Sequence, residues 1–385
     1  MTKLKSVQAL RAIAALLVFG CHLISIEARH AERDTFLTYV MENGAYGVDL
    51  FFVISGFIMV WVAGDTPQSL KHAGDFFYAR VTRIYPLWWL FAGALAVFYL
   101  LFRGVPWDAV RLAQHNMEGI PHLIKSFALW PQTHHPILGV GWTLVHEMYF
   151  YVGFALLIML LPVRWRMTGL LIWGATVLAG GFAGLATAYG GTLFELAFNL
   201  LTLEFVFGAM VGYMIKAGWR SFAWSSLWIG LAAWLIAFFL INNHTGGLLL
   251  APLNLEQPAT FQLMWGRVFL FGLPSAAILY GIVALELDQK LDRWIPNALV
   301  NVGDWSYALY LCHVITIGAI GRAVYALLSP DDPASIAIYI IVSTVFTLTI
   351  AWLSYRWVER PLIHFFRKWR TAPPQRQGPP STATV

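Results

Sequence analysis

The stretch VQALRAIAALLVFGCHLISI, residues 7–26, decides the fold. A run of about 20 predominantly apolar residues has the length of one helical membrane crossing. This run also carries Arg11 and His22, which at about 100° and about 1.5 Å per residue lie on nearly the same helix face, roughly 16 Å apart. Ionisable groups inside a membrane are costly and are usually retained for function. The pair therefore indicates a polar track into the bilayer, and the alternative is a histidine that only packs within the protein.

The composition of the whole chain also indicates a membrane protein. Of its 385 residues, 59% are hydrophobic and 12% are charged, and the mean hydropathy is +0.65. Such a chain has too few polar side chains to cover a water-soluble globule. The sequence therefore predicts an all-α, polytopic bundle of about ten transmembrane helices. The expected spans are 7–26, 46–63, 84–102, 142–161, 167–189, 193–215, 222–242, 265–287, 303–327 and 335–356.

The basic residues predict how this bundle lies in the membrane, because cytoplasmic loops accumulate Lys and Arg. With the N-terminus inside, 18 of the 25 Lys and Arg residues fall on the cytoplasmic side. Both termini are thus expected in the cytoplasm, in a protein of the cell (inner) membrane, with a membrane domain over residues 1–365 and a disordered tail over 366–385. The net charge of +5 is mostly this topological signal, which argues against nucleic-acid binding. A cleaved signal peptide is the competing interpretation of the N-terminus, and the two ionisable residues in its apolar run argue against it.

Two arginines at the cytoplasmic edge of the third span are candidates to bind an anion. Arg80 and Arg83 are three residues apart, so they share one helix face and can grip a polyanion. Arg11 is expected at a similar depth, and the three side chains would suit a phosphorylated cofactor from the cytosol. Alternatively, the two arginines only reflect the general excess of basic residues at the cytoplasmic ends of membrane spans.

The outer half of the membrane is expected to hold different chemistry. Asp49 and Glu147 lie near the outer ends of their spans, in the layer that His22 reaches. A carboxylate beside an imidazole fixes its tautomer and raises its basicity, as a general base for a hydroxyl requires. A structural pairing of Glu147 with a buried His or Arg is the alternative. His134 and His135 are adjacent but lack the spacing of a known metal site, so no metal is expected.

Six motifs, in chain order, resemble the acyltransferase family 3 of integral membrane acyltransferases. They are Arg11-x10-His22, GVDLFFVISGF at 47–57, Arg80-x-x-Arg83-Ile-Tyr-Pro86, Trp142-Thr-Leu-x-x-Glu147-x-x-Phe150-Tyr151, Ser306-Tyr-x-x-Tyr310-x-x-His313 and Val358-Glu359-Arg360-Pro361. Each motif alone is weak, whereas the ordered set spans residue 5 to about residue 365 and is strong. The sequence departs from the pattern at His146, where an apolar residue is common, and this histidine would either tune Glu147 or face a neighbouring helix.

The resemblance implies a membrane-embedded O-acyltransferase. Such enzymes move an acyl group, usually acetyl from cytosolic acetyl-CoA, to a hydroxyl of a glycan or glycolipid at the membrane or its outer side. It implies that His22 is catalytic, by direct base catalysis or through a transient acyl-histidine, and that Arg11, Arg80 and Arg83 bind the donor. Acyl-CoA, a glycan or glycolipid acceptor, the lipid bilayer and the polysaccharide biosynthesis machinery are the expected partners.

The remaining residues of the motifs are assigned to the surroundings of His22. Glu147 or Asp49 would orient its ring. The further candidates to line the same cavity are Ser55, Trp142, Tyr151, Ser306, Tyr310 and His313. A polar seam between packed helices is the alternative for the last three of them.

Two other classes of protein stay open at this level. A secondary transporter that exports a glycan or an acylated precursor would use His22 and Glu147 as a proton relay, although it explains the arginine pair less well. A non-enzymatic scaffold for polysaccharide synthesis would tolerate substitution of His22 and Arg11. Dependence on a CoA thioester separates all three classes.

Overall fold

The chain folds as an all-α bundle. The computed structural model describes residues 3–27, 41–102, 120–185, 191–242, 265–291, 293–329 and 332–371, and every regular element in these ranges is helical. In this part of the chain, nine helices are long and apolar enough to cross a membrane. The polytopic helical bundle expected from the composition is therefore confirmed.

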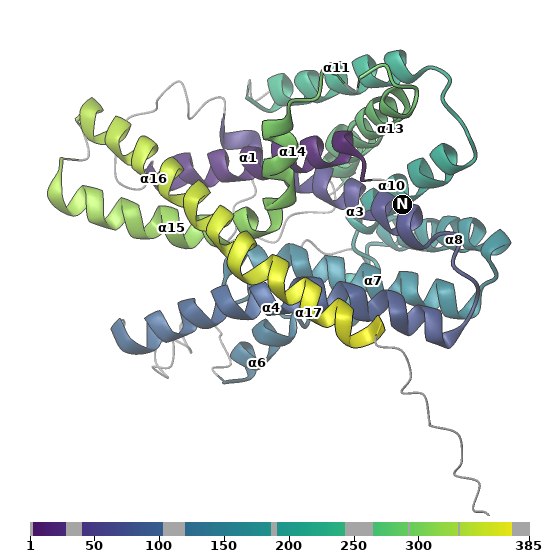
Figure 1. Cartoon of the computed structure of the whole chain (residues 1–385), viewed down its shortest axis with the longest axis horizontal. Coiled ribbons are helices and arrows are strands. Elements are labelled where there is room, and N and C mark those ends of the chain that lie inside the picture. Colours follow the sequence, from purple (N-terminus) through teal and green to yellow (C-terminus); the bar gives the residue numbers. More distant parts are fainter. Residues whose placement is uncertain are drawn as a thin grey trace, which may run out of the picture.

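The elements follow one another in the order shown in Figure 1. They are α1 (Lys5–Glu27), η1 (Glu42–Tyr46), α3 (Gly47–Ala63), α4 (Leu70–Phe102), α6 (Ile120–Ala128), η2 (Gly139–Gly141), α7 (Trp142–Leu160), α8 (Val163–Phe182), α9 (Leu193–Ala197), α10 (Thr202–Lys216), α11 (Ala223–Asn242), η3 (Val268–Gly272), α13 (Leu273–Leu287), α14 (Asn297–Asp304), α15 (Ser306–Leu327), α16 (Pro333–Ser354), η4 (Tyr355–Glu359) and α17 (Arg360–Thr371). The η1 and η2 segments are 3-10 turns, and η3 and η4 are π-helical turns.

Two helical segments extend far beyond the expected spans. The α4 helix begins at Leu70, so Arg80 and Arg83 lie well inside it and not at its start. The α16 helix continues through η4 into α17, which runs to Thr371 and thus past the expected domain boundary at residue 365. Apolar composition marks which residues lie in lipid, and a helix can continue beyond them. The rest of the expected tail, residues 372–385, lies outside the described residues.

The α3 and α10 helices form the closest packing in the core. A Cβ atom added to Gly56 would lie 2.0 Å from the carbonyl oxygen of Phe205, and one added to Gly208 would lie 1.8 Å from that of Val53. Only glycine lets two helix backbones approach this closely. The ring of Phe205 also stacks on that of Phe150 of α7, with ring centroids 4.3 Å apart. This packing aligns α3, α7 and α10, which together position most of the site.

The α8 helix corresponds to the fifth expected span, at 167–189. Because α7 and α10 run in the same direction as α3, the chain has to return between them through α8. This helix is not among the nine apolar spans, and it carries Arg164 and Arg166 in its first turn. The buried Arg166 donates to the carbonyl groups of Ala63 (3.4 Å) and Gly64 (3.0 Å). It therefore caps the end of α3.

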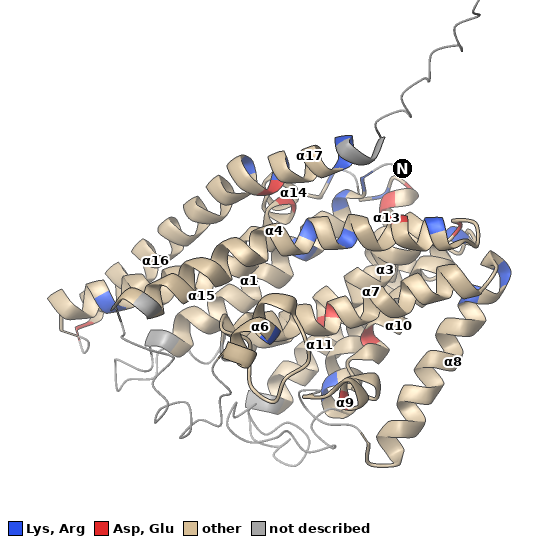
Figure 2. Cartoon of the chain, turned by 90° about the horizontal axis from the view of Figure 1, so that it is seen from below, with Lys and Arg blue, Asp and Glu red and all other residues tan. Residues whose placement is uncertain are grey.

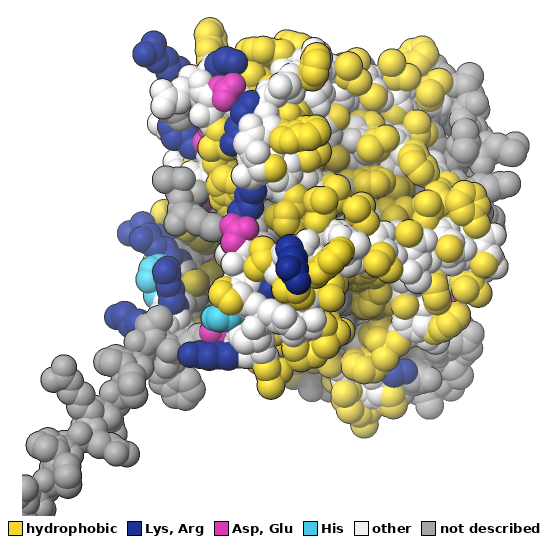
Figure 3. All heavy atoms as spheres, turned by 90° about the vertical axis from the view of Figure 1, so that its right-hand side faces the viewer, with side chains coloured by type: hydrophobic (Ala, Val, Ile, Leu, Met, Phe, Trp, Pro, Cys, Tyr) yellow, Lys and Arg dark blue, Asp and Glu magenta, His cyan; other side chains and the backbone are white. Residues whose placement is uncertain are grey.

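The surface separates into a charged edge and an apolar remainder. Lys and Arg gather on the side of the bundle where the N-terminus, α14 and α17 lie (Figure 2), and the same edge stands out beside an otherwise apolar face in Figure 3. Trp228, Leu235 and Phe239 of α11 are each more than half exposed. Exposed apolar surface of this extent faces lipid or a partner. The molecule is a multi-pass membrane protein.

Candidate active site

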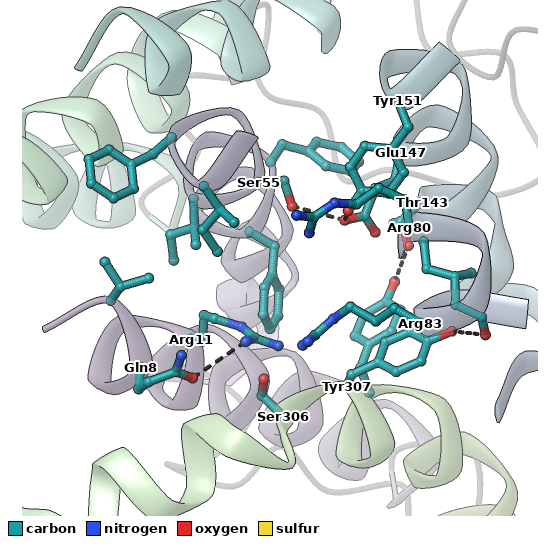
Figure 4. Close-up of a pocket in the computed structure, with 18 of the residues that line it drawn as sticks. Gln8, Arg11, Ser55, Arg80, Arg83, Thr143, Glu147, Tyr151, Ser306 and Tyr307 are labelled. Atoms are coloured by element: carbon teal, nitrogen blue, oxygen red, sulfur yellow. Dashed lines mark hydrogen bonds between the residues drawn. The ribbon is translucent and has the colours of Figure 1, made fainter. Parts of the chain in front are cut away.

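One cavity of about 360 Å³ gathers many of the candidate residues. Its walls come from α1, α3, α4, α7 and the first turns of α15 (Figure 4). The candidate residues that line it are Arg11, Ser55, Arg80, Arg83, Glu147, Tyr151, Ser306 and Tyr310. Apolar side chains, among them Phe51 and Trp61 of α3, complete the lining. A cavity with this lining suits a ligand that is partly charged and partly apolar.

The arginines present their guanidinium groups to this cavity. Arg11 of α1 and Arg83 of α4 point toward one another across it (Figure 4). The guanidinium carbon of Arg80 lies 5.5 Å from the centre of the Phe76 ring and 5.7 Å from that of Tyr151. Within the described residues the buried Nε of Arg80 has no hydrogen-bond partner. Facing like charges repel each other, so this arrangement favours an anion between them.

Glu147 lies beside Arg80 in the same cavity (Figure 4). Its Oε1 accepts hydrogen bonds from the Ser55 hydroxyl (3.0 Å) and from the Tyr151 hydroxyl. These partners differ from the His22 imidazole that the sequence predicts for it. The carboxylate is instead placed as a countercharge at the arginine-lined cavity.

A second carboxylate comes from the far end of the chain. Glu359, in the motif to which the sequence assigns no role, is buried and lies close to both Arg83 and Arg11. It is the last residue of η4, a π-helical turn that contacts α4. The charge balance around the two arginines thus includes a residue that is remote from them in sequence.

His22 is not among the residues that line the cavity, and α15 connects it to the cavity. The ring of Tyr310, a lining residue, lies 5.8 Å from that of His313. The Nε2 atom of His313 lies 3.3 Å from the Nδ1 atom of His22. This corrects the expectation that His313 lines the cavity, because its buried ring packs against His22 instead.

Asp49 belongs to a separate buried cluster. It accepts two hydrogen bonds from Arg267, Nε to Oδ1 at 2.8 Å and Nη2 to Oδ2 at 3.0 Å. Glu204 of α10 is also buried and lies next to both side chains. The guanidinium carbon of Arg267 lies 5.6 Å from the centre of the Trp142 ring. The structure therefore corrects two expectations: Asp49 pairs with an arginine and not with His22, and Trp142 packs on this cluster and not on the cavity.

Sequence reasoning missed Arg267 and Glu204. In the sequence, Arg267 is one of the seven basic residues that are not expected on the cytoplasmic side, and it lies at the start of the span 265–287. A buried Asp49 needs a cation, and this requirement was the available signal. His146, expected either to tune the next residue or to face a neighbouring helix, has its ring centroid 6.2 Å from that of Phe52 on α3.

The connection between α4 and α7, here called the loop (residues 103–141), is described in part. Tyr85, Trp88 and Trp89 of α4 donate to three successive carbonyl groups at the end of α6, over 2.7–3.1 Å. Residues 103–119, the first part of the loop, lie outside the described residues. Among the residues that are described, no group of three His, Cys, Asp or Glu side chains could hold a metal ion. The described part of the loop is thus attached to α4, the helix that carries Arg80 and Arg83, and none of its residues lines the cavity.

Fold and site together define a polytopic membrane protein with an anion-attracting cavity beside a pair of histidines, of which His313 is buried and His22 is half-buried. A family model described as an acyltransferase domain matches residues 4–356, and the chain belongs to this family of acyltransferases. It is similar to the exopolysaccharide production protein ExoZ of Rhizobium meliloti (strain 1021), with 30% identity over 325 residues that cover 83% of this chain and 90% of the relative. It is also similar to the acyltransferase MdmB of Streptomyces mycarofaciens, with 28% identity over 349 residues, 82% of this chain and 79% of the relative. No solved structure matches significantly. The protein is an acyl-transferring enzyme of the membrane.

Proposed function

We propose that this enzyme transfers an acetyl group from cytosolic acetyl-CoA to a hydroxyl of an exported or cell-surface glycan. The observation that carries the proposal is the pair of facing guanidinium groups, Arg11 and Arg83, with Arg80 beside them in one cavity. The name of the relative from Rhizobium meliloti, which refers to exopolysaccharide production, supports a glycan as the acceptor.

The residues present fit a CoA thioester. Its diphosphate and ribose phosphate are the kind of anion that arginine binds through two parallel hydrogen bonds. The partnerless Nε of Arg80 is a donor available to such a group. Lys3 also lines the cavity, next to the N-terminus, which the charge pattern predicts to be cytoplasmic. Apolar residues such as Phe51 line the remaining path, which suits the thin pantetheine arm.

His22 would handle the proton of the acceptor. In direct transfer, its unprotonated ring nitrogen takes the proton from the hydroxyl while the oxygen forms a bond to the thioester carbon. The carbon–sulfur bond breaks, and the proton passes from His22 to the CoA thiolate. In the covalent route the same nitrogen first attacks the thioester carbon, and CoA leaves as its thiolate. The hydroxyl oxygen then attacks the acyl carbon, the carbon–nitrogen bond breaks, and the hydroxyl proton passes to the CoA thiolate. Both routes need that nitrogen to be unprotonated and correctly aimed.

The proposal is tested by adding labelled acetyl-CoA to the cytoplasmic side of inside-out membrane vesicles and measuring label in base-labile ester. Wild type should form labelled ester, His22→Ala should not, and both should insert to the same level. His364→Ala is the matched control, because this histidine is exposed on α17 and should behave as wild type. Full activity in His22→Ala would exclude the catalytic role. No label in wild type with acetyl-, succinyl- or longer acyl-CoA would exclude a CoA thioester as the donor.

A further inference from the structure

His22 and His313 form a pair between α1 and α15, in which His22 is half-buried and His313 is buried. The two rings meet edge to face, with centroids 4.9 Å apart and planes inclined by 71°. His22 Nδ1 lies 2.9 Å from the carbonyl oxygen of Val18 and 3.3 Å from His313 Nε2. His313 Nδ1 lies 3.2 Å from the carbonyl oxygen of Leu309. Each Nδ1 atom therefore faces a group that can only accept a hydrogen bond.

These contacts assign the protons of both rings. A carbonyl oxygen cannot donate, so the Nδ1 atom of each ring carries the hydrogen. A neutral imidazole with a hydrogen on Nδ1 has its lone pair on Nε2. His313 Nε2 is therefore an acceptor for the Nδ1–H of His22, which it shares with the Val18 carbonyl group. The same logic leaves the lone pair of His22 on Nε2, the atom that the proposed reaction uses.

We infer that His313 is a positioning residue that fixes the ring of His22 so that Nε2 is the reacting nitrogen. This inference rests on the proposed function, in which His22 is the base or nucleophile. His313 occupies the place in which the sequence predicts a carboxylate. A neutral imidazole is the less costly partner there, because it accepts a hydrogen bond without bringing a charge into the low-dielectric interior.

The contacts also predict which kinetic constant changes. Without His313, the Nδ1–H of His22 keeps its bond to Val18, but the ring loses the second contact that sets its rotation. The acyl donor binds in the cavity on the other side of Tyr310, whose ring neighbours that of His313. Loss of one neutral hydrogen bond lowers a rate by about tenfold, and loss of a partner that orients a functional side chain lowers activity by about 10–100-fold. We therefore expect kcat to fall while the donor KM stays within about twofold.

Four variants in membranes test this inference. His313→Leu removes the acceptor and should lower kcat about 10–100-fold. His313→Gln should recover most of the activity, because its amide oxygen reaches the position of Nε2, whereas the shorter side chain of His313→Asn should not. Thr316→Val is the matched control, one turn further on α15. The Thr316 hydroxyl bonds to Thr347 and to the backbone carbonyl groups of Cys312 and His313 but not to the His313 ring, so kcat should stay that of wild type.

Assays of wild type and His22→Ala in the same membranes separate the two proposals. Wild type without transfer, or a fully active His22→Ala, overturns the proposed function and with it the inference. If wild type is active and His22→Ala is not, wild-type kcat in His313→Leu would overturn the positioning role alone. Equal activity of His313→Gln and His313→Asn would also overturn it, and this comparison holds even if His313→Leu fails to fold.

Discussion

Replacing Arg267 by methionine tests how the buried charges near the first turn of α3 are balanced. Arg267 makes two hydrogen bonds to Asp49, and both side chains are almost completely inaccessible to solvent, with exposures of 6% and 0%. Methionine keeps most of the volume and removes the charge, so Asp49 stays buried without its cation. Breaking a buried ion pair in this way costs about 3–5 kcal/mol.

Because Glu204 neighbours the ion pair, we expect replacement of Asp49 to cost less stability than replacement of Arg267. Asp49→Asn leaves Arg267 charged, but Glu204 lies next to it and can become its partner. This variant should therefore lose only about 1–2 kcal/mol. Glu204→Gln keeps the ion pair intact and should lose less than about 1 kcal/mol. The double variant Arg267→Met/Asp49→Leu replaces the pair with apolar groups and should recover most of the loss.

The assay is unfolding of wild type and the four variants, purified in detergent, and the single variant Asp49→Leu is added to close a double-mutant cycle around the pair. A loss below about 1 kcal/mol for Arg267→Met would contradict the buried ion pair. An Asp49→Asn variant at least as unstable as Arg267→Met would contradict the role of Glu204 as a second partner. Folded Asp49→Asn should keep the wild-type kcat, because the structure gives Asp49 an arginine and not His22 as its partner.

Three further substitutions test the cavity and the core. Arg83→Gln should raise the KM for acyl-CoA at least about tenfold in steady-state kinetics, since it removes a charge-assisted hydrogen bond. A change in the KM for the acceptor instead would contradict the assignment of Arg83 to donor binding. Glu359→Gln removes a negative charge that competes with the donor for the arginines, so the donor KM should fall about two- to fivefold in the same assay. A rise in the donor KM would show that Glu359 does not compete with the donor. Gly208→Ala places a Cβ atom 1.8 Å from the Val53 carbonyl oxygen and should lower stability by about 1–3 kcal/mol in thermal unfolding. Gly93→Ala is its control, because a Cβ atom there meets open space, and equal stability of the two variants would contradict the close α3–α10 packing.

The sequence alone determined the class of the protein and its family. Hydropathy belongs to consecutive residues, so the membrane spans can be recognised without knowing how the helices pack. Motifs in a fixed order identified the acyltransferase family, which the family match over residues 4–356 confirms. Candidate residues for the chemistry could be named for the same reason, because charge inside an apolar segment is visible in the sequence itself.

Only the tertiary structure decided which of these residues are partners. His22 and His313, Asp49 and Arg267, and Glu359 and Arg83 lie on different helices far apart in the chain. Their pairing depends on the rotation and depth of each helix, which are set by contacts such as the glycine packing of α3 on α10. The hydropathy pattern of the sequence specifies neither the rotation nor the depth of a helix. A carboxylate was therefore the reasonable sequence prediction for the partner of His22, and the packing of α15 against α1 supplied a histidine instead.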